Sequence, residues 1–513
     1  MAAHDRALPI FLLSVMMQAM LRKIRLLADR QASLSVSYLL YTVALGFSGL
    51  IQLGLLFLLA RKLPAPEFGV VALLMIAIPL VSRFVTLGSD IGLAIRIWKR
   101  PREEQQADLN AMLAWTAANT AAVVLAAALV WPLAGFPLPT LFPVCALLAA
   151  AFRSCTEMLQ AMLQREGRTA QVGLVIVFRA LLFGGVCATV VVFIEASSYA
   201  YLFAVLAAEG LTAFWAVFRL HAMYGLRLAN PGSFTRMKSL VRVGFPAIPG
   251  MAAALLLAAG DRFVITAVLG LTATGIYALG QRLAEAMVQM LFVPFSRAFG
   301  PVALGLAARN ESGGLVLIGR TALAFGYVGG AVLGLPAVVA REVILGFAGH
   351  EYEPAALIFL LTLPAVLIYQ MSQIVAVHFS HTEQLHRYVW IIVLAATANI
   401  VTNFAAVHAF GIYGAAMTSL VMFEAVLVAT AMTIRRGGVT LAPLRHLHAP
   451  LMLFGLYLAV IFGIDALTMP ALVIIPAKLI IWAALVALSV AASVEMRDAI
   501  SGMLRRLRTF IAA

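Results

Sequence analysis

The chain has 513 residues, of which 63% are hydrophobic and only 11% are charged, and its mean hydropathy is +1.01. A soluble domain needs roughly a quarter of its residues charged, so this composition excludes a water-soluble globular protein. The three cysteines lie in apolar runs without CxxC or Cys/His spacing, which predicts neither disulfides nor a metal site, and no cofactor is expected. The net charge of +14 could suggest nucleic acid, but the distribution of that charge indicates a membrane protein.

Apolar segments long enough to cross a bilayer recur along the chain. A hydrocarbon core of about 30 Å needs about twenty helical residues. By this measure the sequence predicts an all-α integral membrane protein with about 14 transmembrane helices, several of them joined by very short turns. The predicted spans lie near residues 36–60, 68–97, 109–132, 139–164, 172–194, 199–218, 243–269, 275–300, 316–338, 355–380, 388–410, 412–434, 449–468 and 470–493.

Lys and Arg residues concentrate on one side of these spans. With the N-terminus inside, most of the 36 basic residues fall in cytoplasmic segments, while the opposite loops hold only Arg61, Lys62 and Arg341. The positive-inside rule therefore places both termini in the cytoplasm. The same asymmetry explains the net charge, so no nucleic-acid partner is expected.

Both ends of the chain carry segments outside the spans. Residues 7–21, ALPIFLLSVMMQAML, lack a cleavage site, and the basic cluster follows this apolar stretch rather than preceding it as in a signal peptide. This favours an interfacial segment or an over-extended start. Residues 494–513 place apolar side chains on one stripe beside arginines. That pattern is typical of a basic amphipathic helix on an anionic leaflet, although a frayed solvated tail has the same composition.

Motifs for catalysis are missing from the sequence. It has no Walker A loop, no GxSxG elbow and no HExxH, and the outer loops are short, so the chain is not expected to be an enzyme. Histidines cluster at cytoplasmic span ends, at positions 378, 381, 386, 446 and 448. Without Cys or paired carboxylates they predict interfacial anchoring or a response to pH rather than a metal site.

Ionisable residues within the spans are the main functional signal. An Arg or Lys at the bilayer centre costs on the order of 3 kcal/mol, so deep charges must pair, face a wet cavity, or both. Ion pairs that only hold helices together and a transport site are equally compatible with the pattern. The embedded bases are Arg83, Arg96, Arg153, Arg179, Arg262, Arg282, Arg297, Arg320 and Lys478, and the acids are Asp90, Glu157, Glu209, Asp261, Glu285, Glu424 and Asp465.

The stretch GDRFVITAVLGLTATGIYALGQRLAE (260–285) contains four of these charges. Asp261 lies about 13 Å before the turn and Arg282 about 11 Å after it, so the two are nearly level and a cross-helix ion pair between them is predicted. Arg262 would then point toward a central cavity or toward Glu285. Local pairs are also predicted for Arg282–Glu285, and for Arg153 with the glutamate four residues later.

That same stretch resembles the D-R-x-x-I…L-G…G-x-Y pattern of polysaccharide transporters, the Wzx-like flippases of the MOP exporter superfamily. Three further stretches resemble motifs of this family, at 61–74, 347–359 and 399–419. The last of these departs from the family at Val407–His408, where relatives often carry Ile-Pro. The resemblance covers most of the first twelve spans, and its specificity lies in the order and spacing of the motifs.

The resemblance implies two six-helix lobes around a central cavity, plus two extra C-terminal helices. Leu63 and Gly69 recur as Leu269 and Gly275 at an offset of 206, which suits two halves related by an axis along the membrane normal. The expected divisions are 1–35 (N-terminal segment), 36–242 (N-lobe with its basic linker), 243–436 (C-lobe), 437–493 (spans thirteen and fourteen) and 494–513 (tail).

The resemblance further implies a flippase of the bacterial inner membrane that moves an undecaprenyl-diphosphate-linked oligosaccharide, an O-antigen, exopolysaccharide or capsule unit, by alternating access. Guanidinium groups match phosphate bidentately, so the candidate cationic cavity residues are the deep arginines. These are Arg83, Arg153, Arg179, Arg262 and Arg282, and the candidate ion-coupling residues are Asp90, Glu209, Asp261 and Glu424. Expected partners are the lipid-linked oligosaccharide, membrane lipids, and polymerase and chain-length proteins.

Three alternatives remain open from the sequence. A lipid II flippase or a multidrug antiporter would share the superfamily. A drug cavity should be aromatic and acidic, whereas a flippase cavity should be basic with a lateral opening. A membrane-embedded oligosaccharide polymerase or ligase is a different class, and would usually need a long outer loop with catalytic residues, which the sequence lacks.

Overall fold

The computed structural model describes residues 34–96, 101–133, 139–226, 234–291, 311–382, 384–436, 448–465 and 471–492. All secondary structure in these ranges is helical. The terminal segments predicted at 1–35 and 494–513 fall almost wholly outside them, as does Arg297. In chain order the first helices are α2 (Leu34–Lys62), α3 (Ala65–Thr86), α4 (Ser89–Arg96), α5 (Arg102–Leu133), α6 (Leu141–Arg165), α7 (Thr169–Phe193), α8 (Ser198–Tyr224) and α9 (Phe234–Gly244).

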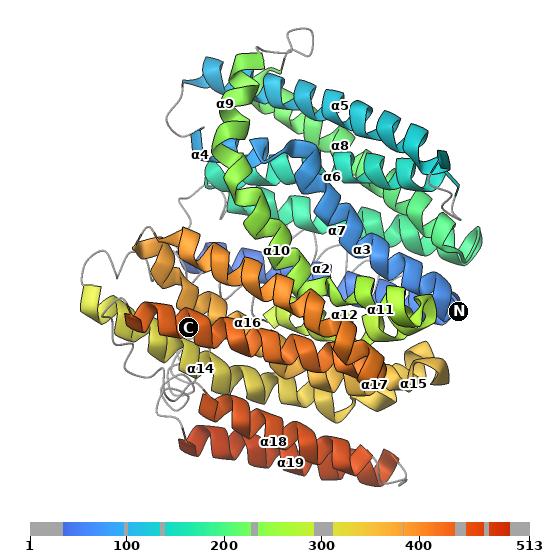
Figure 1. Cartoon of the computed structure of the whole chain (residues 1–513), viewed down its shortest axis with the longest axis vertical. Coiled ribbons are helices and arrows are strands. Elements are labelled where there is room, and N and C mark those ends of the chain that lie inside the picture. Colours follow the sequence, from blue (N-terminus) through green and yellow to red (C-terminus); the bar gives the residue numbers. More distant parts are fainter. Residues whose placement is uncertain are drawn as a thin grey trace, which may run out of the picture.

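These helices form the first half of the molecule, and a second half follows. Its elements are η2 (Phe245–Ala247), α10 (Ile248–Ala259), α11 (Asp261–Leu269), α12 (Leu271–Leu291), α14 (Glu311–Val338), α15 (Ala340–Ala348), η3 (His350–Tyr352), α16 (Pro354–His381) and α17 (Leu385–Arg436). A C-terminal hairpin, α18 (His448–Asp465) and α19 (Ala471–Ala492), completes the described chain. In Figure 1 the helices run side by side across the view, with the first half above the second and the hairpin at the bottom.

Twelve helices in the described part of the chain are long and apolar enough to cross a membrane. One of them, α17, has 52 residues and doubles back at Gly411, whose φ of 61° lies in the left-handed region that favours glycine. It therefore provides two spans. Helix α12 is not one of these twelve, but its 21 residues are about 32 Å long. With these additions the helices match the predicted spans, and the all-α membrane class is confirmed.

Two predicted spans are interrupted helices. The span at 68–97 breaks at Leu87 and Gly88, both with positive φ, so that α4 leaves the line of α3. The span at 243–269 contains the 3-10 turn η2 and a junction at Gly260 between α10 and α11. Pro246 and Pro249, at the starts of η2 and α10, explain the interruption at η2, since proline cannot donate a backbone hydrogen bond.

The two halves meet through a reciprocal contact between α3 and α12. A Cβ placed on Gly69 would lie 2.2 Å from the Leu271 carbonyl oxygen, and one on Gly275 would lie 2.3 Å from the Ala65 carbonyl oxygen. Ala65 and Leu271 are themselves separated by 206 residues, the offset that relates the two glycines. The contact is thus of the self-complementary kind expected of a two-fold repeat, and only glycine allows so close an approach.

Packing within the halves follows the same scheme. Helix α6 packs between α3 and α8 in the first half, as α16 packs between α12 and α17 in the second. The hairpin packs on α14, and α18 also contacts α16. Its docking includes a fully buried lysine, Lys478, which lies 2.5 Å from Asp465 and 3.4 Å from Glu342 and donates to the Val338 carbonyl.

Candidate functional site

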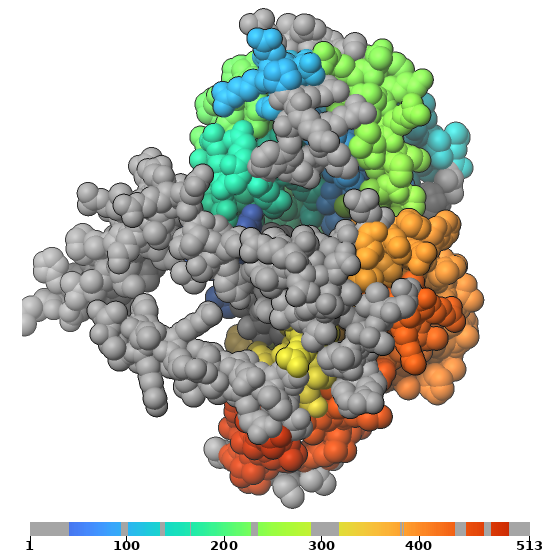
Figure 2. Space-filling view, turned by 90° about the vertical axis from the view of Figure 1, so that its left-hand side faces the viewer, coloured from blue at the N-terminus to red at the C-terminus, as the bar shows by residue number. Residues whose placement is uncertain are grey.

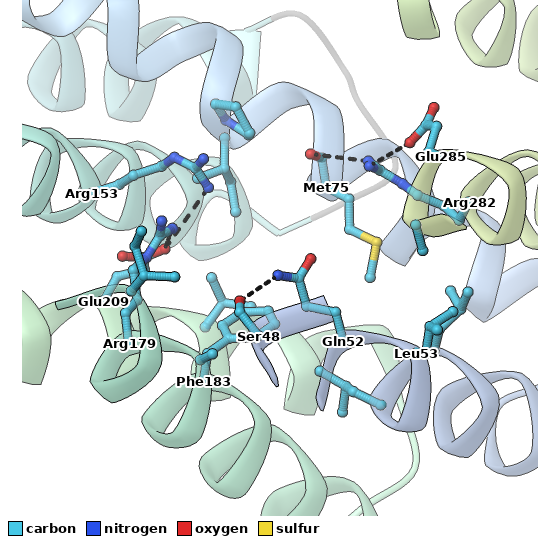
Figure 3. Close-up of a pocket in the computed structure, with 18 of the residues that line it drawn as sticks. Ser48, Gln52, Leu53, Met75, Arg153, Arg179, Phe183, Glu209, Arg282 and Glu285 are labelled. Carbon is cyan, nitrogen blue, oxygen red and sulfur yellow. Dashed lines mark hydrogen bonds and ion pairs between the residues drawn. The ribbon is translucent and has the colours of Figure 1, made fainter. Parts of the chain in front are cut away.

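A cavity of about 450 Å³ lies at mid-depth between the two halves. Five helices of the first half line it, namely α2, α3, α6, α7 and α8, together with α12 of the second half. Because the interior of a membrane protein is otherwise close-packed, a space of this size among polar side chains is a candidate binding site. Figure 3 shows Arg153, Arg179 and Glu209 on one side of it and Arg282 with Glu285 on the other.

Three of the five predicted cavity arginines line this space: Arg153, Arg179 and Arg282. They come from three different helices, and each side chain keeps 22–25% of its surface exposed. Arg83, 29% exposed, lies beside the cavity and is linked to it only through Glu157, which also contacts Arg153. Arg262 is 0% exposed and does not line the cavity.

The first half holds its arginines in a chain of alternating charges. Arg83 contacts Asp90 at 3.3 Å and Glu157 at 3.1 Å. Glu157 in turn accepts from Arg153 Nε at 2.9 Å, the local pair that the i, i+4 spacing predicts. The chain links α4, α3 and α6, so these charges join helices and also reach the cavity wall.

Glu209 on α8 continues the chain inside the cavity. Its Oε1 accepts from Arg179 Nη2 and lies 4.0 Å from Arg153 Nη1. Its other oxygen, Oε2, is buried and has no hydrogen-bond partner. One carboxylate oxygen therefore serves two guanidinium groups.

The second half pairs its charges differently from the prediction. Arg282 contacts Glu285 at 2.9 Å and donates to the Met75 carbonyl of the first half at 3.4 Å. Arg262 contacts the other oxygen of Glu285 at 3.3 Å, and its Nε donates to Gln281. Both arginines thus share Glu285, which agrees with the predicted i, i+3 pair and with one of the two orientations expected for Arg262.

The predicted ion pair between Asp261 and Arg282 is not present. Asp261 instead accepts hydrogen bonds from the Tyr277 hydroxyl and from Ser419 Oγ at 3.3 Å. The prediction used only the level of the two residues along their helices and had no information on helix rotation. Asp261 faces α17 and Arg282 faces the cavity, so their side chains point in different directions.

The four predicted ion-coupling residues are scattered. Glu209 lines the cavity, whereas Asp90 and Asp261 are held in the contacts above and are not part of its wall. Glu424 lies on the second arm of α17, where His448 at the start of α18 approaches it to 3.0 Å. The structure does not bring the four together.

Sequence reasoning missed some cavity residues. Ser48 and Gln52 on α2 line the cavity and are joined by a 3.0 Å hydrogen bond. They are polar side chains in an otherwise apolar span, a signal that a search restricted to charged residues does not detect.

One end of the cavity is closed by the contact between α3 and α12, at the loops predicted to face outward. Phe68 packs edge-on against Tyr352 there, with ring centroids 5.8 Å apart. From the cavity the lining extends the other way to Gln160, five residues before α6 ends at Arg165. Figure 2 views the molecule from the end that carries α4 and α9, with the first half above the second.

Similarity to solved structures supports the architecture. The lipid II flippase MurJ in an inward closed conformation has a TM-score of 0.69 at 14% identity, over 90% of this chain and 100% of that one. An inward-facing multidrug resistance MATE transporter of the MOP superfamily has a TM-score of 0.56 at 13% identity, over 80% and 95%. A MOP superfamily transporter from Pyrococcus furiosus, described for the reverse polarity of its binding pocket, has a TM-score of 0.57 at 13% identity, over 82% and 98%.

At such identities these similarities establish the fold alone, and no curated protein matches the sequence. The family assignment comes from the sequence, since the model of a family described as polysaccharide biosynthesis protein matches residues 58–357. This match covers more than half of the chain. The protein is therefore a multi-pass membrane protein that belongs to this polysaccharide biosynthesis protein family, and it has the helical fold of the transporters named above.

Proposed function

We propose that the protein is a flippase that moves a polyprenyl-diphosphate-linked oligosaccharide across the bacterial inner membrane. The observation that carries this proposal is the cavity between the halves, in which Arg153 and Arg179 face Arg282. The family description adds the polysaccharide pathway. Together they favour a saccharide carried on a phosphorylated lipid.

The chemistry of the substrate explains these side chains. A diphosphate and a string of hydroxyls lose their hydration in hydrocarbon, so the path must replace it. Arginine suits the phosphates, because its planar fork can bind two oxygens at once. Arg282 lines the cavity with a quarter of its side-chain surface exposed, so its guanidinium is accessible from the cavity. Ser48 and Gln52 provide partners for sugar hydroxyls.

Movement between the leaflets follows from the position of the cavity. The contact of α3 with α12 closes one end, and Arg282 bridges the halves below it through the Met75 carbonyl. Substrate phosphate would compete for the Arg282 donors and loosen this bridge. The halves would then separate at the closed end while the polyprenyl tail stays in lipid. The positive-inside distribution makes the closed end periplasmic and both termini cytoplasmic.

The rival functions account less well for the cavity. A multidrug antiporter would require an aromatic and acidic lining, yet here three arginines face two carboxylates, Glu209 and Glu285. Lipid II shares the diphosphate carrier, and the family description favours repeat units of O-antigen, exopolysaccharide or capsule over it. A polymerase or ligase would form or break glycosidic bonds, and the same assay can detect this. The pathway's polymerase and chain-length proteins would receive the flipped unit.

The test is a flipping assay in proteoliposomes with a fluorescent undecaprenyl-diphosphate-linked oligosaccharide in the inner leaflet. We expect the wild-type protein to expose the sugar to an impermeant quencher and Arg282→Ala to lower the rate at least about tenfold, as loss of a charge-assisted contact implies. Arg341→Ala is the matched control, because it breaks an ion pair with Glu353 far from the cavity.

Three outcomes would contradict the proposal. In the first, the folded wild-type protein leaves the sugar in the inner leaflet. In the second, Arg282→Ala is as active as Arg341→Ala. In the third, the glycan product is longer or shorter than the added substrate, which would indicate a polymerase or ligase. Addition of lipid II as a competitor distinguishes the two lipid-linked substrates.

A further inference from the structure

Each arginine of the cavity wall is already paired with a carboxylate in the absence of substrate. In the first half Arg83, Arg153 and Arg179 are matched by three carboxylates of the alternating chain. In the second half Arg262 and Arg282 share Glu285. An anionic headgroup therefore meets guanidinium groups that already contact carboxylates.

Glu209 is the carboxylate that occupies the position between two cavity arginines where such a headgroup would bind. It lines the cavity, its side chain is only 3% exposed, and its Oε1 accepts from Nη2 of Arg179 and approaches Arg153. The other acid bound to Arg153, Glu157, does not line the cavity. A phosphate that enters between Arg153 and Arg179 has to take the place of Glu209.

The hold of Glu209 on these arginines is incomplete. Its Oε2 is buried without any hydrogen-bond partner, so Oε1 alone contacts both guanidinium groups. A diphosphate presents several oxygens and can bind both guanidinium groups bidentately, which a single carboxylate oxygen cannot do. The exchange of Glu209 for phosphate thus increases the number of charge-assisted hydrogen bonds, at the cost of releasing one buried carboxylate.

We propose that Glu209 is a built-in stand-in for the substrate phosphate, which holds Arg153 and Arg179 in the empty cavity and returns to them when the headgroup leaves. This proposal rests on the proposed function. It gives Glu209 two effects: it weakens binding by competition, and it speeds release by reoccupying the arginines. Without it the headgroup would be bound tightly and moved slowly.

Other charged and titratable groups also face Glu209. They are Arg179 and Cys187 on α7, Arg153 on α6, and Tyr201 on α8. Only the two arginines can pair with a carboxylate. The competition therefore depends on them, and removal of one should remove the effect of Glu209.

The experiment measures binding of farnesyl diphosphate to the purified full-length protein in detergent at fixed ionic strength. We expect Glu209→Gln, which keeps the size of the side chain, to lower the Kd about tenfold, since a competing charge next to the phosphates is removed. In proteoliposomes the same variant should flip more slowly than wild type. Glu166→Gln is the matched control, because it breaks the 2.6 Å pair with Arg168 outside the cavity and should change neither quantity.

A double-mutant cycle separates competition from a general rise in positive charge. In the Arg179→Gln background, Glu209→Gln should improve the Kd less than about twofold, because the guanidinium that it frees is absent. Thermal unfolding of each variant verifies that it is folded. Should Glu209→Gln misfold, Glu209→Asp provides the second test. Its shorter side chain withdraws from Arg179, so binding should again be tighter than in wild type.

The outcomes distinguish this inference from the function on which it rests. If wild type and Glu209→Gln both fail to bind farnesyl diphosphate, the proposed function is wrong. If wild type binds and the folded Glu209→Gln variant binds equally or more weakly, only the stand-in role is wrong. An equal gain in the Arg179→Gln background would also overturn it.

Discussion

At the scale of single residues, exposure separates the embedded arginines into two kinds. Arg153, Arg179 and Arg282 keep about a quarter of their side-chain surface open to the cavity, whereas Arg262 is fully buried. An arginine without water contact cannot receive substrate unless the helices come apart. Arg262 is therefore assigned to holding α11 against α12, through Gln281 and Glu285.

This assignment predicts a stability effect for Arg262→Met that Arg282→Ala does not share. Loss of the guanidinium leaves Glu285 with Arg282 alone and Gln281 Oε1 without its donor, and an unsatisfied buried polar group costs about 2 kcal/mol. Thermal and denaturant unfolding in detergent should detect this loss of stability as a lower midpoint. Full stability of Arg262→Met together with loss of flipping would place Arg262 in the substrate path instead.

At the scale of elements, the pairing of α3 with α12 decides which end of the molecule is closed. The helices touch backbone to backbone at Gly69 and Gly275, so the closure depends on the absence of a side chain rather than on an attractive group. Contacts of this kind are bistable, because a Cβ cannot be accommodated by small adjustments. The equilibrium between closed and open forms should therefore respond to a single methyl group.

Gly69→Ala should open the predicted periplasmic end. A shift of about 1 kcal/mol multiplies the population of a minor open state about fivefold. The measurement is the labelling rate of a cysteine at Gln52 by an impermeant thiol reagent added outside, with Cys145, Cys155 and Cys187 replaced.

Gly54→Ala on α2 is the control for this experiment, since a Cβ there meets nothing within 4 Å. It should leave the labelling rate of the cysteine at Gln52 unchanged. Equal rates for Gly69→Ala and the control would show that this contact does not determine closure.

At the scale of the whole molecule, the sequence predicts the spans well and the contacts between them poorly. Hydropathy locates each apolar segment because lipid acts on every span in the same way. Depth is predictable too, since the rise per residue is fixed, and Arg262, the neighbour of Asp261, shares Glu285 with Arg282. Their partners depend on helix rotation and on which helices are neighbours, so Tyr277 and Ser419 could not have been identified as partners of Asp261.

The cavity illustrates the same limit. Its wall combines residues from six helices spread from Leu45 to Ala286, and no local pattern marks them as neighbours. Charge within a span was a sufficient signal for Arg153, Arg179 and Arg282. It also selected Arg262, which has the same depth and chemistry but the opposite exposure. Only packing distinguishes these arginines.

The reciprocal contact predicts how the two halves move as bodies. If they are rigid and pivot about the mid-membrane bridge of Arg282 with Met75, opening at one end must narrow the other. Spin labels at Glu195 and Glu351 report the predicted outer end, and labels at Gln164 and His386 report the inner end. On introduction of Gly69→Ala, double electron–electron resonance should show the outer distance increase and the inner distance decrease together. An outer increase with an unchanged inner distance would mean that α3 or α12 bends alone, and alternating access would then need a moving part smaller than a half.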